Sequence, residues 1–180
     1  MNGISPAEAA HRAASDAEPV LWVDEQDRPL GVLPRAELRE RRLIGRATFI
    51  FLFNGRGELC VHQRTHSKAL YPGYWDLAAG GMVGPDEDSL TAAERELGEE
   101  LGVIGLPLQA LGQMFFEGAE NRLWCHVYQT QGDQPLRLQA EEVLQARYLD
   151  LAAVQALIDS QPVCPDSLAA WRCCRPAPIC

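Results

Sequence analysis

The sequence predicts an α+β fold, in which strands and helices are mixed without a regular strand–helix–strand alternation. Several short segments rich in β-branched and aromatic residues are bounded by turn residues, as strands are. Helical patterns are fewer, and they do not follow each strand in turn. The 180 residues, of which 47% are hydrophobic and 23% charged, suffice for one domain with a buried core. Together these features favour α+β over a parallel α/β fold.

Eight segments are rich in strand-forming residues, and each predicts a strand. The first two flank the sequence DEQDRP and the next two flank GRGE, so we expect two hairpins. The first hairpin would extend the domain at its N-terminal side and could pair across a two-fold axis, giving a homodimer. The predicted strands are residues 20–23, 30–34, 47–54, 59–64, 75–79, 113–117, 121–130 and 147–151.

Four segments predict helices, and both ends of the chain predict flexible segments. Residues 1–18 are Ala-rich, polar and aperiodic, so we expect them to be disordered. Residues 19–175 are expected to form a single domain, and residues 176–180 a flexible tail. The predicted helices are residues 35 to about 45, residues 90–101, residues 152–159 and residues 166–174.

Charge and composition exclude several classes of partner. The formal net charge of −9 argues against binding to nucleic acid or to an anionic membrane. No apolar run reaches the ~18 residues of a membrane-spanning helix, and the N-terminal sequence lacks the basic start and apolar centre of a secretion signal. The six cysteines lack C-x-x-C spacing. We therefore expect a cytoplasmic protein with free thiols, and Cys60 and Cys125 in its core.

The predicted helix at residues 90–101 has an apolar face. Leu90, Ala93, Leu97 and Leu101 recur at helical spacing, so we expect them to be buried. A proline and three acidic residues precede the helix, and both suit a helix N-terminus.

The same helix carries a cluster of carboxylates. Glu96 and Glu100 are one turn apart, and Glu99 lies three residues beyond Glu96, so all three lie on one side. Like charges at this spacing repel by a few tenths, about 0.2–0.5 kcal/mol, per exposed pair. Carboxylate oxygens are the ligands that Mg²⁺ and Mn²⁺ prefer, and a bound cation would offset the repulsion. The alternative is a solvated acidic face.

The spacing of these residues matches a known motif. The run GMVGPDEDSLTAAERELGEELGV fits G-x5-E-x7-R-E-U-x-E-E-x-G-U at every fixed position, where U is aliphatic. This is the Nudix box, and the chain resembles the Nudix hydrolase superfamily. The resemblance implies a Nudix-like α/β/α sandwich with a mixed central sheet, here with an N-terminal hairpin extension and C-terminal helices. The matching residues are Gly81, Glu87, Arg95, Glu96, Leu97, Glu99, Glu100, Gly102 and Val103.

The resemblance also implies an activity. Members of the superfamily typically use a divalent metal to hydrolyse a diphosphate linkage in a nucleoside diphosphate joined to another moiety. A small-molecule diphosphate is therefore the expected substrate, and Mg²⁺ or Mn²⁺ the expected cofactor. The implied metal ligands are Glu96, Glu99 and Glu100, with the backbone carbonyl of Gly80 or Gly81 as a further ligand.

Other residues take supporting roles under the same resemblance. Arg95 would pair with Glu87 and hold the loop of the box against its helix. A proton acceptor is also needed, either a glutamate of the box or one in a later loop. In that loop, Glu142 of the pair Glu141–Glu142 is our first candidate, the alternative being a solvated turn.

Positive charge lies in two places that could contact phosphate. Arg64, His66 and Lys68 lie in or beside the loop next to the expected cleft, and we expect them to bind substrate. Five arginines between residues 35 and 46 could form a phosphate-binding rim or a solvated surface.

A narrower resemblance covers most of residues 19–103 and points to the branch that includes isopentenyl diphosphate isomerase. That enzyme requires a cysteine and a metal-binding histidine, and this chain has Gly80 and Met82 at the aligned positions. Arg122 also interrupts the later E-N-E pattern. Isomerase chemistry is thus disfavoured relative to hydrolysis, and a non-catalytic nucleotide-binding module is a further alternative.

Overall fold

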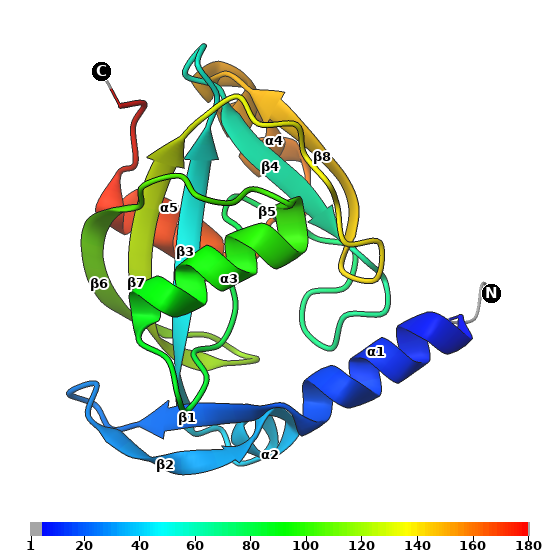
Figure 1. Ribbon diagram of the computed structural model, residues 1–180, viewed down its shortest axis with the longest axis vertical. Coiled ribbons are helices and arrows are strands. Elements are labelled where there is room, and N and C mark those ends of the chain that lie inside the picture. The colour runs from blue at the N-terminus through cyan, green and yellow to red at the C-terminus, as the bar shows by residue number, and fades with distance from the viewer. Residues whose placement is uncertain (1–4, 180) are drawn as a thin grey trace.

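The computed structural model describes residues 5–179, which form five helices and eight strands (Figure 1). The helices are α1 (Pro6–Ala17), α2 (Arg35–Glu40), α3 (Ser89–Leu101), α4 (Leu151–Ser160) and α5 (Pro165–Cys174). The strands are β1 (Pro19–Val23), β2 (Pro29–Pro34), β3 (Ile44–Phe53), β4 (Leu59–Arg64), β5 (Trp75–Asp76), β6 (Gln109–Glu117), β7 (Arg122–Gln131) and β8 (Val143–Leu149).

All eight strands belong to one mixed sheet. Its main path is β2-β1-β3-β4-β5, while β7 pairs with β3 and β6, and β8 pairs with β4. Strands β3 and β7 are parallel, from Ile44 opposite Arg122 to Phe53 opposite Gln131. The other strand pairs are antiparallel, including the predicted hairpins β1–β2 and β3–β4. The structure therefore confirms the predicted α+β fold with a mixed central sheet.

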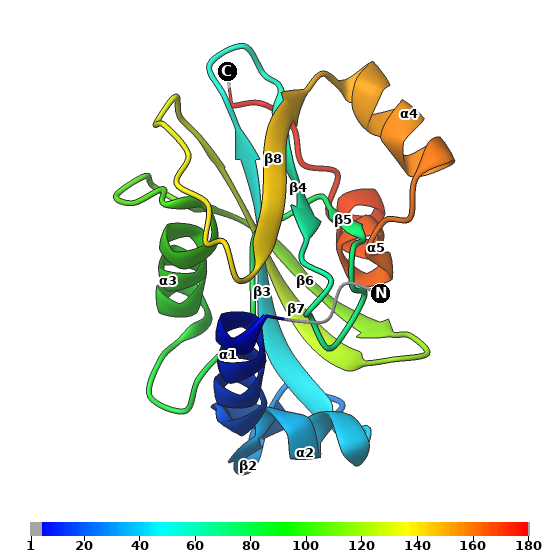
Figure 2. The same cartoon turned by 90° about the vertical axis from the view of Figure 1, so that its right-hand side faces the viewer.

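Helices cover both faces of this sheet, which gives three layers. Figure 2 shows α3 on one face and α4 and α5 on the other. Side chains alternate along a strand, so β3 supplies both layers of the core. Phe49, Phe51 and Phe53 belong to the cluster that includes residues of α4 and α5. Ile50 and Leu52 belong to the cluster that includes Ala93, Leu97 and Leu101 of α3.

Residues 6–17, part of the segment that was expected to be disordered, form helix α1 in the structure. A capping box begins the helix: Ser5 Oγ accepts from Glu8 N at 3.2 Å, and Glu8 Oε2 accepts from Ser5 N at 2.8 Å. Pro6 occupies the first turn, where it is favoured. No residue of α1 is buried, so the helix adds no side chain to the core. Residues 1–4 lie outside the described part.

Helix α2 is shorter than predicted. It ends at Glu40, and β3 begins at Ile44. Between them Arg42 adopts a left-handed backbone with a φ of 51°, which helical residues do not. Residues 44 and 45 then pair with β1 and β7. This pairing makes residues 44 and 45 part of a strand, although the charged pattern of the segment favoured a helix.

Helix α3 follows its prediction closely. Asp88 caps its N-terminus by accepting from Thr91 N at 2.8 Å, and Gly102, with a φ of 70°, ends it. Ala93, Leu97 and Leu101 are buried as expected, but Leu90 is 42% exposed. Leu90 lies in the first turn, and Ala92 is buried there instead.

The C-terminal segment and the cysteines complete the comparison. Ala177 N and Ile179 N donate to the side chains of Gln129 and Gln131 on β7, at 3.0 and 2.7 Å. The predicted flexibility of the tail stays a prediction, and residue 180 lies outside the described residues. Cys60 and Cys125 are buried free thiols, as expected. None of the helices in residues 5–179 has the length and apolarity that crossing a bilayer requires.

Candidate active site

Arg95 connects the loop before α3 to the helix itself. Its guanidinium donates to Glu87 from Nη2 at 2.7 Å and from Nε at 3.1 Å, which is the predicted pair. The same Nη2 donates to the carbonyl oxygen of Met82 at 3.3 Å, and Gly84 N donates to Glu87 at 2.8 Å. These contacts fix the loop over residues 82–87 against α3.

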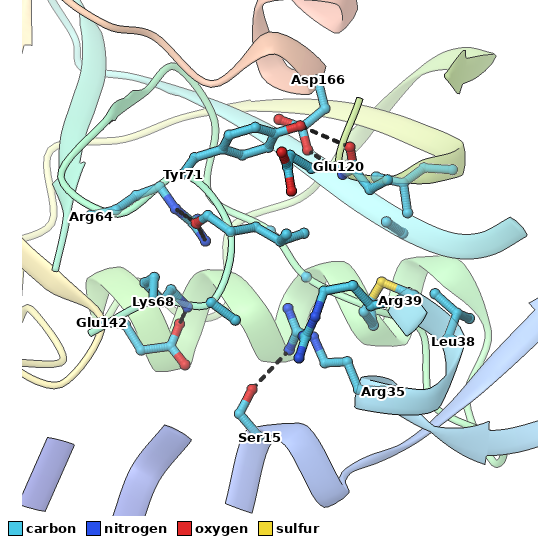
Figure 3. Close-up of a pocket in the computed structure, with 18 of the residues that line it drawn as sticks. Ser15, Arg35, Leu38, Arg39, Arg64, Lys68, Tyr71, Glu120, Glu142 and Asp166 are labelled. Carbon is cyan, nitrogen blue, oxygen red and sulfur yellow. Dashed lines mark hydrogen bonds and ion pairs between the residues drawn. The ribbon is translucent and has the colours of Figure 1, made fainter. Parts of the chain in front are cut away.

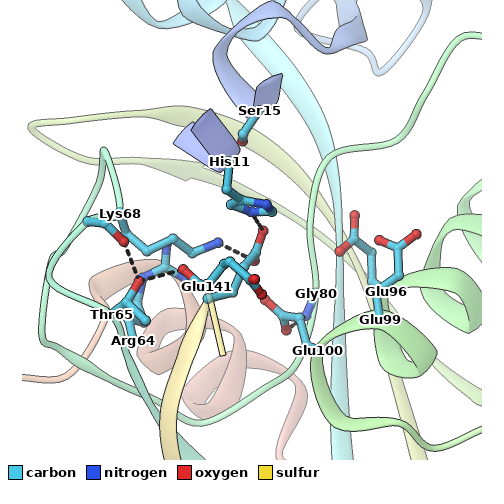
Figure 4. A network of polar contacts seen from close by, with 12 residues as sticks. His11, Ser15, Arg64, Thr65, Lys68, Gly80, Glu96, Glu99, Glu100 and Glu141 are labelled. Atoms are coloured by element: carbon cyan, nitrogen blue, oxygen red, sulfur yellow. Dashed lines mark hydrogen bonds and ion pairs between the residues drawn. The ribbon is translucent and has the colours of Figure 1, made fainter. Parts of the chain in front are cut away.

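The carboxylates of the box are held in two different ways. Arg95 Nη1 lies 2.9 Å from Glu96 Oε1 and 3.1 Å from Glu99 Oε2. Glu100 Oε2 instead accepts from Gly80 N at 3.0 Å. Figure 4 shows Glu96 and Glu99 side by side, with Glu100 beside Gly80. Glu96 is 8% exposed and Glu100 is 2% exposed, whereas Glu99 is exposed.

Burial changes the acidity of two of these groups. It raises the pKa of Glu96 to about 7, although the positive charge of Arg95 opposes the shift. It likewise raises the pKa of Glu100 to about 8, opposed by Lys68 and reinforced by the neighbouring charge of Glu96. Both carboxylates therefore lack sufficient positive charge in their surroundings.

The three carboxylates of the box do not converge on one point in this structure. Within residues 5–179, no group of three or more His, Cys, Asp or Glu side chains lies close enough together to hold a metal ion. The reason is that Arg95 binds Glu96 and Glu99, while Glu100 binds the backbone of Gly80. The donors nevertheless suit a hard divalent cation, because all three are carboxylates and two of them, Glu96 and Glu100, are buried.

Gly80 and Gly81 allow the backbone to pass close to other groups. A Cβ atom at Gly81 would lie 2.2 Å from Glu96 Oε1, and one at Gly80 would lie 2.0 Å from the carbonyl oxygen of Thr48. Only glycine leaves room at either position. Gly81 O accepts from Thr48 N at 2.9 Å. No hydrogen bond to Gly80 O is found among the described residues.

Glu142 lies across the cavity from the box. Its Oε2 forms a close ion pair with Lys68, and its Oε1 lies 2.7 Å from His11 Nε2 (Figures 3 and 4). Burial alone would raise the pKa of Glu142, but Lys68 and the hydrogen bond from His11 outweigh it and lower that pKa to about 2. Thr65 holds this loop, since its N donates to Glu142 O at 3.0 Å and its hydroxyl to Glu141 O at 2.9 Å. Glu142 is thus ionised at neutral pH.

The predicted phosphate-binding residues divide into two groups. Arg64 and Lys68 line the same cavity as Glu96, Glu99 and Glu142. His66 is exposed and does not line it. The His66 ring lies against Gly73, where a Cβ atom would be 2.6 Å away. The structure therefore does not bring His66 to the site, because the loop turns its side chain outward.

A second cavity adjoins the first, and Lys68, Arg64, Gly80 and Glu142 line both. Figure 3 shows Leu38, Arg35 and Arg39 of the α2 segment on one side of it. Thr48, fully buried on β3, also lines it, and its hydroxyl has no hydrogen-bond partner in the described structure. Its wall also includes the apolar residues Leu43, Ala47, Phe49, Ala69, Leu70, Ala78, Met82 and Leu123.

Sequence reasoning missed His11 as part of this site, and it left Arg35 and Arg39 open between a phosphate-binding rim and a solvated surface. His11 lies in the segment that was expected to be disordered. Arg35 and Arg39 contact Ser15 and Asp16 of α1, at 3.3 and 3.0 Å. The sequence signal that could have revealed α1 is the S-x-x-E capping box of Ser5 and Glu8, which includes Pro6.

Comparison with known proteins identifies the family. A model of the NUDIX domain matches residues 43–170. The chain belongs to the Nudix hydrolase family. It is 62% identical over 165 residues to the uncharacterized Nudix hydrolase PA4841 of Pseudomonas aeruginosa, covering 91% of this chain and 96% of that protein. It is 36% identical over 152 residues to the uncharacterized Nudix hydrolase YfcD of Escherichia coli K12, covering 83% of each chain.

Solved structures support the Nudix fold. The crystal structure of DR0079 from Deinococcus radiodurans matches with a TM-score of 0.73 and 27% identity, covering 87% of this chain and 99% of that one. A MutT protein from Methanosarcina mazei Go1 matches with a TM-score of 0.60 and 22% identity, covering 71% of this chain and 89% of that one, which shows the fold alone. The Nudix match begins at residue 43, so α1, the β1–β2 hairpin and α2 precede it.

Proposed function

We propose that this Nudix protein hydrolyses a phosphoanhydride bond in a nucleoside diphosphate linked to another moiety, or in a similar small organic diphosphate. One observation carries the proposal. Glu96 and Glu99 of the Nudix box line the same cavity as an ionised Glu142 and its partner Lys68. A diphosphate in that cavity would have positive side chains on one side and carboxylates able to recruit a cation on the other.

We propose Mg²⁺ or Mn²⁺ as the cofactor, held by Glu96, Glu99, Glu100 and the carbonyl of Gly80. The raised pKa of Glu96 and of Glu100, caused by burial, supports this choice, because Arg95 and Lys68 offset the burial only in part and a cation would stabilise both ionised groups. Gly80 is preferred to Gly81 since the latter's carbonyl already accepts from Thr48 N. When bound, such an ion polarises a phosphate oxygen and lowers the pKa of a bound water.

The residues of the chain itself then bind and orient the substrate. Lys68 and Arg64 would contact phosphate oxygens, Lys68 as a mobile point charge and Arg64 through its fixed fork. Glu142 would accept the proton of the attacking water, because it is ionised and lines the same cavity. Arg95 and Glu87 would keep the backbone of the box in position.

Isomerase chemistry is not supported. A cysteine at position 80 would place its Cβ atom 2.0 Å from Thr48 O, closer than any real contact. Met82 is 6% exposed and belongs to the apolar core, so it is not placed as a metal ligand. Hydrolysis therefore remains the proposed reaction.

The test is a substrate screen. Purified protein is incubated with nucleoside diphosphates linked to a sugar, a nucleotide or an alkyl group, and with isopentenyl diphosphate, in Mg²⁺, Mn²⁺ or chelator. Phosphorus NMR identifies the bond that breaks. We expect cation-dependent cleavage of a phosphoanhydride in at least one compound and no isomerised product. Isothermal calorimetry of cation uptake supplies a second readout, and absence of both uptake and cleavage would refute the proposal.

A further inference from the structure

Helix α1 is attached to the rest of the protein by polar contacts. Ser15 Oγ accepts from Arg35 at 3.3 Å, and Asp16 pairs with Arg39 at 3.0 Å. His11, one turn before Ser15, lies 2.7 Å from Glu142. Figure 2 shows α1 beside α2 at one end of the molecule, and Figure 4 shows His11 directed from α1 into the site. No residue of α1 is buried, so these polar contacts determine where it lies.

The contact between His11 and Glu142 fixes a carboxylate that Lys68 also holds. Lys68 binds Oε2, while His11 Nε2 faces Oε1. Glu142 is ionised, and an ionised carboxylate only accepts hydrogen bonds, so Nε2 is the donor. Two donors on the two oxygens determine both the position and the rotation of the carboxylate plane.

In the proposed reaction, Glu142 and the substrate phosphate compete for the ammonium group of Lys68. Lys68 is the partner of Glu142 in this structure, and in the proposed reaction it contacts substrate phosphate. A phosphate group carries more charge than a carboxylate, so substrate draws the ammonium group away from Glu142. The hydrogen bond from His11 is the contact of the Glu142 side chain that this exchange leaves in place among the described residues.

We propose that His11 is a positioning residue, which holds the carboxylate of Glu142 in its reactive orientation while Lys68 binds the substrate. The inference rests on the proposed role of Glu142 as the proton acceptor. Because α1 precedes the residues that match the NUDIX domain, the N-terminal extension supplies a functional side chain to the site of that domain. In this role His11 acts through Glu142.

A purely structural role would have a different signature. If His11 only attached α1, breaking another attachment of the same helix would have the same effect on catalysis. Asp16→Asn provides this comparison, because it weakens the ion pair with Arg39 and leaves the contact with Glu142 intact. Amide hydrogen exchange over residues 6–17 measures how far each variant loosens the helix.

The experiment compares His11→Ala, His11→Gln and Asp16→Asn with the wild-type protein, on a substrate and cation found by the screen. We expect His11→Ala to lower kcat about tenfold with KM changed less than about twofold, because a misplaced group costs rate more than binding. His11→Gln should recover most of the loss, since its amide donates from nearly the same place as Nε2. Asp16→Asn should raise exchange in α1 but keep kcat within about twofold.

A double variant connects the effect to Glu142. Glu142→Gln should lower kcat about 100-fold, within the usual range for general base catalysis, and adding His11→Ala should lower it no further. Unchanged kcat in His11→Ala, equal losses in Asp16→Asn, or a further loss in the double variant would overturn the inference alone. A wild-type protein that cleaves no diphosphate, or a fully active Glu142→Gln, would overturn the proposed function and the inference with it.

Discussion

Gly81 and Glu96 are so close that a Cβ atom on Gly81 would lie 2.2 Å from Glu96 Oε1. Glu96 is nearly buried and Arg95 holds its carboxylate, so the side chain has little freedom to move aside. Position 81 of the box therefore requires glycine for a direct steric reason. It makes room for the carboxylate of the residue fifteen positions later.

Gly81→Ala should displace Glu96 and lower both stability and activity. We expect a loss of about 1–3 kcal/mol in the free energy of unfolding, the usual cost of overpacking, measured by urea denaturation. The double variant Gly81→Ala with Glu96→Ala removes the clashing carboxylate, so stability should recover while activity stays low. If Gly81→Ala alone were as stable as wild type, the Glu96 side chain would be free to move aside, contrary to this prediction.

Glu100→Gln should separate activity from stability. We expect the turnover of Glu100→Gln to fall by orders of magnitude. Without divalent cations and at alkaline pH, its free energy of unfolding should exceed that of wild type. Burial raises the pKa of Glu100 to about 8 from 4.5, so its contribution to stability is fully present below about 4.5 and is lost as pH rises through about 8.

The measurement for this prediction is thermal unfolding between pH 6 and pH 9 in chelator. Wild type should lose stability across this range relative to Glu100→Gln, by on the order of 1 kcal/mol or more. Glu94→Gln, an exposed position on the same helix, is the matched control and should follow wild type. Parallel curves for all three proteins would contradict the assigned burial of Glu100.

Glu142→Gln should have the opposite pH dependence. Lys68 and His11 overcome the effect of burial and lower the pKa of Glu142 to about 2, below the ordinary 4.5. Its contribution to stability is thus present above about pH 4.5 and is lost as pH falls towards 2. We expect the variant to be about 1–3 kcal/mol less stable at pH 7, because Lys68 loses its partner. As pH falls towards 2, the free energies of unfolding of wild type and Glu142→Gln should converge. A difference that stays constant with pH would contradict this account.

Thr48→Val should stabilise the protein. The hydroxyl of Thr48 is fully buried and has no hydrogen-bond partner within the described structure, so it carries a desolvation cost. Valine has nearly the same shape and removes that cost, and we expect a gain of about 1 kcal/mol by urea denaturation. Thr48→Ser, which keeps the hydroxyl, is the control and should show no gain. A destabilised valine variant would show that the hydroxyl has a partner.

The sequence predicted well those features that depend on local pattern. The helix over the Nudix box shows apolar spacing, acidic residues at its start and Gly102 at its end, and α3 has these boundaries. The pair Arg95–Glu87 follows from the motif, and the hairpins follow from their turns. Each signal lies within a few residues, or within one known motif, so no tertiary information was needed.

The features it did not predict depend on contacts between distant segments. The parallel pairing of β3 with β7 joins residues nearly eighty positions apart, and α1 docks through polar contacts with residues at least twenty positions away. The retention of Glu96 and Glu99 by Arg95 was missed for another reason. Spacing on a helix places carboxylates on one side, but it does not show whether they bind a metal ion or the guanidinium group of an arginine.

The two ends of the chain have different surroundings, and this matters for building fusion proteins. Helix α1 borders the cavity through His11 and Ser15, whereas residues 177–179 lie along β7, towards the opposite end of the molecule (Figure 1). A purification tag or reporter joined ahead of α1 would lie near this cavity. The same tag joined after the last residue would lie farther from it, so it is the better choice for kinetic work.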